Sequence, residues 1–560
     1  SNQSKIEREK ILNTLIDALS EAASTTRGIQ FFDRSGSITR FNYSELYADA
    51  QKIARVMAQH GLAPGQSAGL VFSTSYEFVR QLFGVLLAGG VPFCLAPPRL
   101  GRAADYSEYT ARMINSAGAR FVIHEDSIGG SLAKVAARTS SPFIPVSQIV
   151  ADIASASPET KSVTRDRPAL IQFSSGTTVD PKPVVLTHGN LVSNTKSILE
   201  RFPGDINDHS GLSWLPMHHD MGLIGGLFSA VMGKGDITFL RPEDFVMRPA
   251  LWLRALSETK ATTCPCPNFA LKLCTDRIET EDVKDLDLSH WQIALVGAET
   301  VHLSTLRDFA EKFAITKFRY AAFTPVYGLA EATLAVTFSD LSSPPHAERF
   351  DSALLSQGKA VETSETGGSL EIASVGKPLS GFELQIRDDS GAEAQEGQVG
   401  RIFLRGESIM QGYLGQPPHE GWLDTGDLGF IHKGDLYIYG RAKDVIIING
   451  RNHDPAYIEF ATEGVPGIRH ERTAAFAVSS DTRATEGFIL LVEKEKGDLR
   501  NQEEVVTLVR DSVTEKTGLI PDSVHIIEIG QMPRTTSGKV RRAEARRQFL
   551  SGKIAALASS

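Results

Sequence analysis

The residues best suited to chemistry stand in a loop at positions 174–183. Apolar runs at 169–173 and 184–186 flank this loop and predict two strands. Backbone N–H groups, hydroxyls and the ammonium group of Lys182 could converge there on an anion such as a phosphate, although an ordinary turn has a similar composition. The Walker A pattern is absent. Five small or hydroxyl-bearing residues form the anion-binding half: Ser174, Ser175, Gly176, Thr177 and Thr178.

A pair of histidines follows a second apolar run, at 213–217. His218 and His219 could act as bases or metal ligands, and a hydrogen-bonded structural pair is the alternative. Because adjacent residues on an extended segment point to opposite sides, both imidazoles could not easily hold one metal ion. Met221 and Gly222 continue the run into a glycine-rich turn.

Further segments carry candidate residues whose alternatives are plain turns or solvated charges. Asp427 can accept two hydrogen bonds from ribose hydroxyls, and Arg441 supplies a planar donor for the same ligand. An Asx-turn is the alternative interpretation of Asp427. The other candidates are Gly297, Ala298, Glu299, Tyr327, Gly328, Glu331 and Lys539.

Six ordered motifs between Ser174 and Lys539 resemble those of the acyl-adenylate-forming superfamily, which includes acyl-CoA ligases, luciferases and peptide-synthetase adenylation domains. The run at 213–222, and Ala330 followed by Glu-Ala-Thr, resemble the fatty acyl-AMP ligase version. The resemblance implies ATP and Mg²⁺ as cofactors. Glu331 and Thr177 would hold the metal.

The same resemblance implies roles for the other candidates. The turn at 297–299 and Tyr327-Gly328 would bind adenine, with the tyrosine ring stacked on the base. His219 would lie where the acyl and phosphate sites meet, beside Met221 and Gly222 on the acyl side. Lys443 would be a hinge. Lys539 would be the catalytic lysine, which binds the carboxylate and the α-phosphate together.

The segments that must position these residues predict an α/β fold. Apolar runs alternate with helical segments from 68 to 124, which predicts a first lobe with a mainly parallel sheet. The pattern over residues 31–42 predicts a strand pair. We expect a large N-terminal adenylation domain of two α/β sheet subdomains and a small β-rich subdomain over 1–442, followed by a small mobile α+β domain over 443–560.

Residues 340–372 form a stretch that compact adenylating enzymes mostly lack. Its only hint of a strand is Ala360-Val361, so it is predicted to be an insertion or long loop. The resemblance implies that this insertion packs against the first lobe and is associated with loss of transfer to coenzyme A.

Composition and charge exclude some classes of function and partner. The 560 residues carry a net charge of −9, which argues against a nucleic-acid partner. We expect a cytoplasmic chain without a transmembrane segment. The basic cluster at 541–547 predicts one face of a terminal helix, with a docking surface for an acidic partner as the alternative. Cys264 and Cys266 lack zinc spacing and are expected to be packed thiols.

These observations lead to one prediction with two alternatives. The chain is expected to be a fatty acyl-AMP ligase that joins a fatty acid to ATP and passes the acyl group to an acyl carrier protein on a separate chain. The first alternative is a medium- or long-chain acyl-CoA ligase. The second is a nucleotide-binding regulator that has lost catalysis, which the presence of both Glu331 and Lys539 disfavours.

Overall fold

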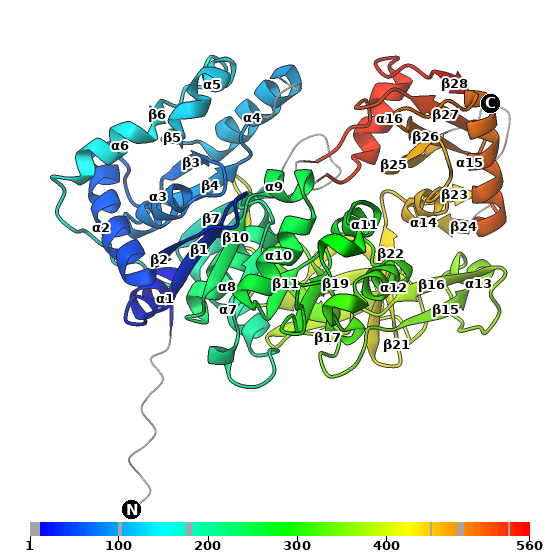
Figure 1. The fold of residues 1–560 in the computed structure, drawn as a ribbon, viewed down its shortest axis with the longest axis horizontal. Helices are drawn as coiled ribbons and strands as arrows, with labels where there is room; N and C mark the ends of the chain where they lie inside the picture. The colour runs from blue at the N-terminus through cyan, green and yellow to red at the C-terminus, as the bar shows by residue number, and fades with distance from the viewer. Residues whose placement is uncertain are drawn as a thin grey trace, which may run out of the picture.

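The computed structural model describes residues 12–98, 103–174, 182–448, 451–478, 487–535 and 538–559. Figure 1 shows an α/β lobe at the N-terminal end, a large sheet in the middle and a separate lobe at the C-terminal end. Among the described residues, no helix combines the length and apolarity needed to cross a membrane. The four cysteines are unpaired and buried in the core.

The first lobe contains a four-stranded sheet in the order β4-β3-β5-β6, and every neighbouring pair is parallel. The predicted mainly parallel sheet is therefore confirmed. The side chains of these strands are buried, or nearly so, on both faces, as is usual for a parallel sheet under helices. The elements are α1 (Leu15–Ala22), α2 (Tyr43–Gln59), β3 (Ser67–Val71), α3 (Tyr76–Leu87), β4 (Val91–Leu95), α4 (Ala103–Ala117), β5 (Phe121–His124), α5 (Gly129–Ala136), β6 (Phe143–Pro145) and α6 (Val146–Ile153).

The central sheet has nine strands in the order β17-β14-β13-β12-β11-β9-β10-β1-β2. The strand pair predicted near the N-terminus is present, but its first strand pairs in parallel with β10 and so joins this sheet. The strands are β1 (Gly28–Phe32), β2 (Ile38–Asn42), β9 (Gly211–Ser213), β10 (Ile237–Leu240), β11 (Thr263–Pro265), β12 (Ile293–Val296), β13 (Phe323–Gly328), β14 (Ala335–Phe338) and β17 (Lys377–Pro378).

Helices cover this central sheet (Figure 1). One of them, Met221–Phe228, is a π-helix, an uncommon element that is frequently found at functional sites. The others are α7 (His188–Leu199), α8 (Ser229–Met232), α9 (Pro242–Met247), α10 (Ala250–Thr259), α11 (Asn268–Arg277) and α12 (Leu303–Lys312).

Two small antiparallel sheets complete the N-terminal part. The strands predicted on either side of the loop at 174–183 are both present and pair with each other. In the other sheet, buried and exposed side chains alternate along the 400–406 strand, as predicted for a half-buried strand. The strands are β7 (Pro168–Phe173), β8 (Pro183–Thr187) and β20 (Gly412–Tyr413), then β18 (Phe382–Arg387), β19 (Gly400–Gly406), β21 (Leu423–His432) and β22 (Asp435–Arg441).

The insertion differs from its prediction in two ways. It is not a long loop with a strand at 360–361: β15 (Ala347–Asp351) and β16 (Ser369–Ala373) pair antiparallel, with α13 (Ser352–Leu355) between them. Its described contacts also lie away from the first lobe, since Phe350 packs against Phe430 and Tyr437 of β21 and β22. Figure 1 shows the two regions at opposite ends of the N-terminal domain. A shared hydrophobic cluster fixes this position, because Phe350, Leu355, Ala360 and Ile372 of the insertion are buried together with Phe430, Tyr437 and Tyr439.

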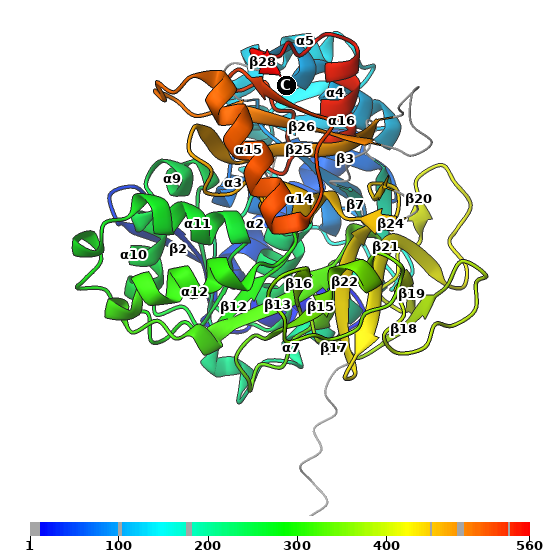
Figure 2. The ribbon, with the colours of Figure 1, turned by 90° about the vertical axis from the view of Figure 1, so that its right-hand side faces the viewer.

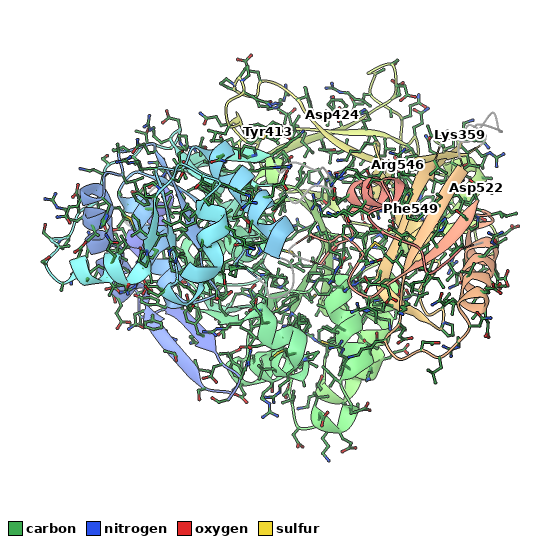
Figure 3. All side chains as sticks on the ribbon, turned by 90° about the horizontal axis from the view of Figure 1, so that it is seen from above. Lys359, Tyr413, Asp424, Asp522, Arg546 and Phe549 are labelled. Carbon is green, nitrogen blue, oxygen red and sulfur yellow. The ribbon has the colours of Figure 1, made fainter. Side chains whose placement is uncertain are left out.

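The C-terminal part has its own hydrophobic core around a four-stranded sheet, β25-β26-β27-β28. It lies over α11, α12 and β22 (Figures 1 and 2). Figure 3 shows Arg546 and Phe549 on α16, where the phenyl ring packs near Phe476 and the guanidinium Nε donates to the Ala477 carbonyl. The elements are β23 (Ile446–Ile448), β24 (Arg451–His453), α14 (Pro455–Phe460), β25 (Ile468–Val478), β26 (Gly487–Lys494), α15 (Gln502–Thr517), β27 (Ser523–Ile527), α16 (Arg542–Leu550) and β28 (Ala558–Ser559).

Candidate active site

A cavity of about 520 Å³ lies between the N-terminal and C-terminal parts. Ser175, Gly176, Thr177 and Thr178 fall outside the described residues. Most of the other candidates line the cavity: Ser174, Lys182, Met221, Ala298, Glu299, Tyr327, Gly328, Glu331, Asp427, Arg441, Lys443 and Lys539. The structure therefore brings together residues that are far apart in the sequence.

Three of the described candidates are not among the residues that line the cavity. Gly222 lies against the Pro216 carbonyl, where a Cβ would come within 2.3 Å of the oxygen. Gly297 lies against Val326, with only 2.7 Å between the position of a Cβ and the valine Cγ2. The His219 ring packs near His218, with the ring centroids 4.8 Å apart.

Asp427 is the centre of a buried polar cluster. Register pairing of β21 with β22 places it opposite Arg441, whose Nε lies 2.9 Å from Oδ1. The Tyr327 hydroxyl donates to Oδ2 at 2.7 Å. Burial raises the pKa of Asp427, and the neighbouring guanidinium opposes that shift. Each carboxylate oxygen keeps a second lone pair, so the group can still accept hydrogen bonds from a ligand.

Glu331 lies in a short helical turn that also lines the cavity. Its Oε1 accepts a hydrogen bond of 2.9 Å from the Tyr413 hydroxyl. The Lys182 ammonium group lies 4.9 Å from the centre of the same tyrosine ring. Tyr413 thus connects two candidates from different motifs. The sequence contained no signal for Tyr413, which comes from the two-residue strand β20.

Lys539 enters the cavity from a narrow loop of the C-terminal part. The Thr535 amide donates to its carbonyl at 2.8 Å, and its own amide donates to Thr535 Oγ1 at 3.1 Å. Burial lowers the pKa of Lys539, while the negative charges of Glu299 and Asp220 oppose this shift. These carboxylates therefore favour a protonated, positively charged lysine.

Asp220 is a site residue that the sequence analysis did not select, although it follows the two histidines directly. It accepts a hydrogen bond of 2.7 Å from the Met221 amide at the start of the π-helix. Burial raises its pKa, and Lys539 lowers it. Glu299 similarly accepts from the Phe269 amide at 3.1 Å, and burial raises its pKa. The left-handed conformation of Ala298, with φ +72°, turns the chain between β12 and Glu299.

The C-terminal part contributes acidic and imidazole groups that no motif indicated. His470 pairs with Glu463 through Nδ1, and its Nε2 lies 3.6 Å from Glu471 Oε1. Glu471 has φ +51°, an uncommon conformation for a residue with a Cβ. All three line the cavity. Among the described residues, no group of three or more His, Cys, Asp or Glu side chains is arranged to hold a metal ion.

One part of the cavity lining, called the apolar branch below, consists mostly of apolar residues. Gly225 and Gly226 of the π-helix leave this wall without side chains, and a Cβ at Gly225 would lie 3.0 Å from Leu334. Such a lining suits a flexible hydrocarbon chain better than a polar ligand. Its larger side chains are Ile198, Phe202, Leu212, Ile237, Leu295, Val326, Leu334 and Phe338.

This two-part α/β architecture and its interdomain cavity define a class of adenylate-forming enzymes. A family model described as AMP-binding enzyme matches residues 19–414, and another, described as Disco-interacting protein 2-like, AMP domain, matches residues 443–559. The chain belongs to the AMP-binding enzyme family and is an ATP-dependent, AMP-forming ligase. The superfamily predicted from the motifs is confirmed.

Individual relatives extend over nearly the whole chain. It is 32% identical to the medium-chain fatty acid–acyl-carrier-protein ligase JamA of Moorena producens, over 97% of this chain and 96% of the relative. It is 31% identical to the long-chain fatty acid–AMP ligase FadD26 of Mycobacterium tuberculosis, over 91% of each. A Caulobacter vibrioides relative with a provisional acyl-CoA synthetase name is 33% identical, over 96% of each.

The structural comparison agrees with the sequence comparison. A structure from a study of fatty acyl-adenylate ligases of E. coli and L. pneumophila has a TM-score of 0.90 and 32% identity. The match covers 97% of this chain and 98% of that one. The predicted fold class, a large N-terminal domain of several sheets followed by a small C-terminal domain, is confirmed. The boundary at residues 442 and 443 stays a prediction, as does the role of Lys443 as a hinge.

Proposed function

We propose that this enzyme joins a fatty acid to ATP, giving acyl-AMP and pyrophosphate, and then passes the acyl group to the phosphopantetheine thiol of an acyl carrier protein on a separate chain. The main support for this proposal is that the buried Asp427 cluster, Lys539 and the apolar branch line one and the same cavity. The names of the Moorena and Mycobacterium relatives support a fatty acid as the substrate.

In the first step a carboxylate oxygen attacks the α-phosphorus, and the bond from that phosphorus to the β-phosphate oxygen breaks. Both reactants are anions, so the protein's contribution is mainly orientation and charge neutralisation. Lys539 would stabilise the charge on the reacting centre, and Lys182 the charge on the phosphates. Asp427 would bind the ribose hydroxyls, with Tyr327 and Gly328 beside the adenine.

Glu331 supplies a hard oxygen ligand of the kind that Mg²⁺ prefers, and Thr177 is the second proposed ligand. One or two protein oxygens suffice, because protein-bound Mg²⁺ usually keeps several waters and binds phosphate oxygens as well. The ion would neutralise phosphate charge as it develops. Tyr413 would orient the Glu331 carboxylate through its hydrogen bond.

The acyl chain would occupy the apolar branch, with its carboxylate near Lys539. Met221 lines this cavity, while His219 and Gly222 would shape its wall from behind. The test is to incubate the purified protein with ATP and fatty acids of graded length, with and without coenzyme A and a carrier protein. Acyl-AMP formation that depends on fatty acid supports the proposal. Absence of acyl-AMP with every chain length would refute it.

We expect Asp427→Ala to weaken ATP binding by about 1.5–3 kcal/mol, because the ribose loses a charged acceptor. The change also leaves the Arg441 guanidinium and the Tyr327 hydroxyl without their common partner. Calorimetric titration with ATP measures the effect. The matched control is Asp424→Ala on the same strand. Asp424, labelled in Figure 3, forms an ion pair with Arg401 at the protein surface. Equal ATP affinity of the Asp427 variant and the unaltered chain would rule out ribose binding.

The acyl-CoA ligase alternative shares the first step and differs in the acceptor. The insertion bears on this choice because it touches the C-terminal part directly: the Asn452 amide donates to the Ser356 carbonyl at 3.1 Å. Such a contact would restrain the rotation needed to admit a thiol. Rapid acyl-CoA synthesis by the unaltered chain would favour this alternative.

Replacing residues 352–368 with Asn-Gly, a two-residue hairpin turn, removes this contact while retaining β15 and β16. We expect acyl-CoA output to rise about two- to tenfold, the scale of one lost hydrogen bond, with acyl-AMP formation largely unchanged. Chromatographic measurement of both products tests this, and a thermal melt of each protein serves as the folding control. Unchanged acyl-CoA output in a folded variant would contradict the restraining role.

A further inference from the structure

The C-terminal part contacts the N-terminal part at several places around the cavity. One is the Asn452–Ser356 hydrogen bond, and another is the Arg541 guanidinium, 5.5 Å from the centre of the Tyr109 ring. The most regular contact is an aromatic stack. The imidazole of His302 lies parallel to the ring of Phe460, with centroids 3.7 Å apart and an angle of 8° between the ring planes.

The stack joins the ends of two helices from different parts of the chain. His302 is the N-cap residue of α12, and Phe460 is the last residue of α14. Tyr457 lies one turn earlier on α14. Its ring is nearly perpendicular to the same imidazole, with the ring centroids 6.3 Å apart and an angle of 88° between the ring planes. All three side chains line the cavity that contains Lys539. None of the hydrogen bonds between described residues involves the His302 ring nitrogens, so ring stacking is its main interaction.

Helix α14 is also tied to the loop that carries Lys539. Glu459, the neighbour of Phe460, accepts two hydrogen bonds from Arg542, at 2.6 Å from Nε and 2.7 Å from Nη2. Arg542 follows Lys539 by only three residues. A bidentate pair of this kind fixes both distance and angle. The stacked Phe460 is therefore linked through Glu459 and Arg542 to the segment that carries Lys539.

We propose that His302 is a positioning residue for adenylation: its imidazole, stacked on Phe460, positions the C-terminal part so that Lys539 reaches the reacting phosphate. This inference rests on the proposed role of Lys539 in acyl-AMP formation. The contact exists only when the two parts are docked. Its loss therefore shifts the docking equilibrium and leaves the nucleotide site of the N-terminal part intact.

The proposal implies a pH dependence with a defined sign. Burial lowers the pKa of docked His302 from 6.5 to about 4. Among the neighbouring ionisable groups, Tyr457 on α14 contacts the ring, Glu459 on α14 is paired with Arg542, and Glu299 stands three residues before His302 in the chain. When the parts separate, the imidazole regains its ordinary pKa. The equilibrium constant for docking is thus highest above about pH 6.5 and decreases as the pH falls toward 4, by about thirtyfold between pH 8 and pH 5.

The test compares His302→Ala and His302→Phe with the unaltered chain. Phenylalanine keeps a ring for stacking but cannot be protonated, whereas alanine removes the stack. Acyl-AMP formation is measured from pH 5 to 8.5. We expect His302→Ala to lower kcat about three- to tenfold at pH 8, with little change in the KM for ATP. His302→Phe should retain kcat at pH 8 and should lose less activity at pH 5 than the unaltered chain does.

Docking is measured independently of activity by the distance between spin labels at Ser390→Cys and Ser551→Cys, two exposed positions on different parts. The four native cysteines are buried, which limits labelling elsewhere. The docked population should fall in His302→Ala at every pH. In the unaltered chain it should fall only at acid pH, and in His302→Phe it should hardly change. Leu499→Ala, at a side chain that is 98% exposed, is the matched control.

Two results would overturn the inference. One is an unaltered distance distribution in folded His302→Ala. The other is a loss of activity at acid pH in His302→Phe that equals the loss in the unaltered chain. Because the distance measurement requires no catalysis, a protein that docks as described but forms no acyl-AMP would refute the proposed function and leave the docking role standing. A double-mutant cycle with Phe460→Ala completes the test, and additive effects of the two substitutions would also count against the stack.

Discussion

Replacing Lys539 with alanine should lower the rate of acyl-AMP formation by about two to four powers of ten, the scale of losing a key electrostatic group. The amino group lies buried in the cavity near Glu299 and Asp220, whose negative charges oppose the lowering of its pKa by burial. ATP binding should survive, because the Asp427 cluster belongs to the N-terminal part. Single-turnover formation of acyl-AMP measures the rate, and calorimetry measures nucleotide binding.

The control for this variant is Lys496→Ala, which removes the same charge from an exposed position of the same C-terminal part. It should leave the rate unchanged, because an exposed charge at a distance is screened by solvent and salt. A Lys539→Ala protein with near wild-type adenylation would end the catalytic assignment.

Glu331→Gln should weaken Mg²⁺-dependent ATP binding about ten- to a hundredfold, with a matching loss of adenylation at low Mg²⁺. Glutamine keeps an oxygen of similar shape and its bond from Tyr413, but it lacks the negative charge that attracts the cation. Titration of Mg²⁺ at constant ATP, followed by acyl-AMP formation, measures the apparent affinity. Excess Mg²⁺ should restore part of the activity.

Tyr413→Phe distinguishes the effect of the Glu331 charge on Mg²⁺ binding from the effect of the orientation of its carboxylate. It retains the Glu331 carboxylate and removes the hydroxyl that donates to it, so we expect a smaller loss of Mg²⁺ affinity than for Glu331→Gln. An unchanged Mg²⁺ dependence in Glu331→Gln would exclude this residue as the metal ligand, whatever the effect on overall rate.

Much of the fold was predictable because local sequence patterns encode its elements. Both strands around the loop at 174–183 were visible as apolar runs, and alternating strands and helices indicated the parallel sheet of the first lobe. The strands of the insertion were not visible. Along β15 only Phe350 is fully buried, and its burial depends on rings about eighty residues away.

For the site, short motifs determined which residues to consider, because side-chain type and spacing limit the available chemistry. Type and spacing placed Lys182, Asp427 and Arg441 among the candidates, and the resemblance to the superfamily added Glu331 and Lys539. The roles of these residues remain predictions. The motifs did not indicate Tyr413, Asp220 or the His302–Phe460 stack.

The sequence by itself therefore determined the class of the enzyme, the order of its elements and the residues able to do chemistry, because these depend on local patterns. Only the tertiary structure decided which sheet receives β1, where the insertion packs, which side chain donates to Glu331 and which rings stack between the two parts. Those outcomes depend on contacts between segments far apart in the chain. Such contacts are selected by shape, burial and register, for which single residue types carry little local signal.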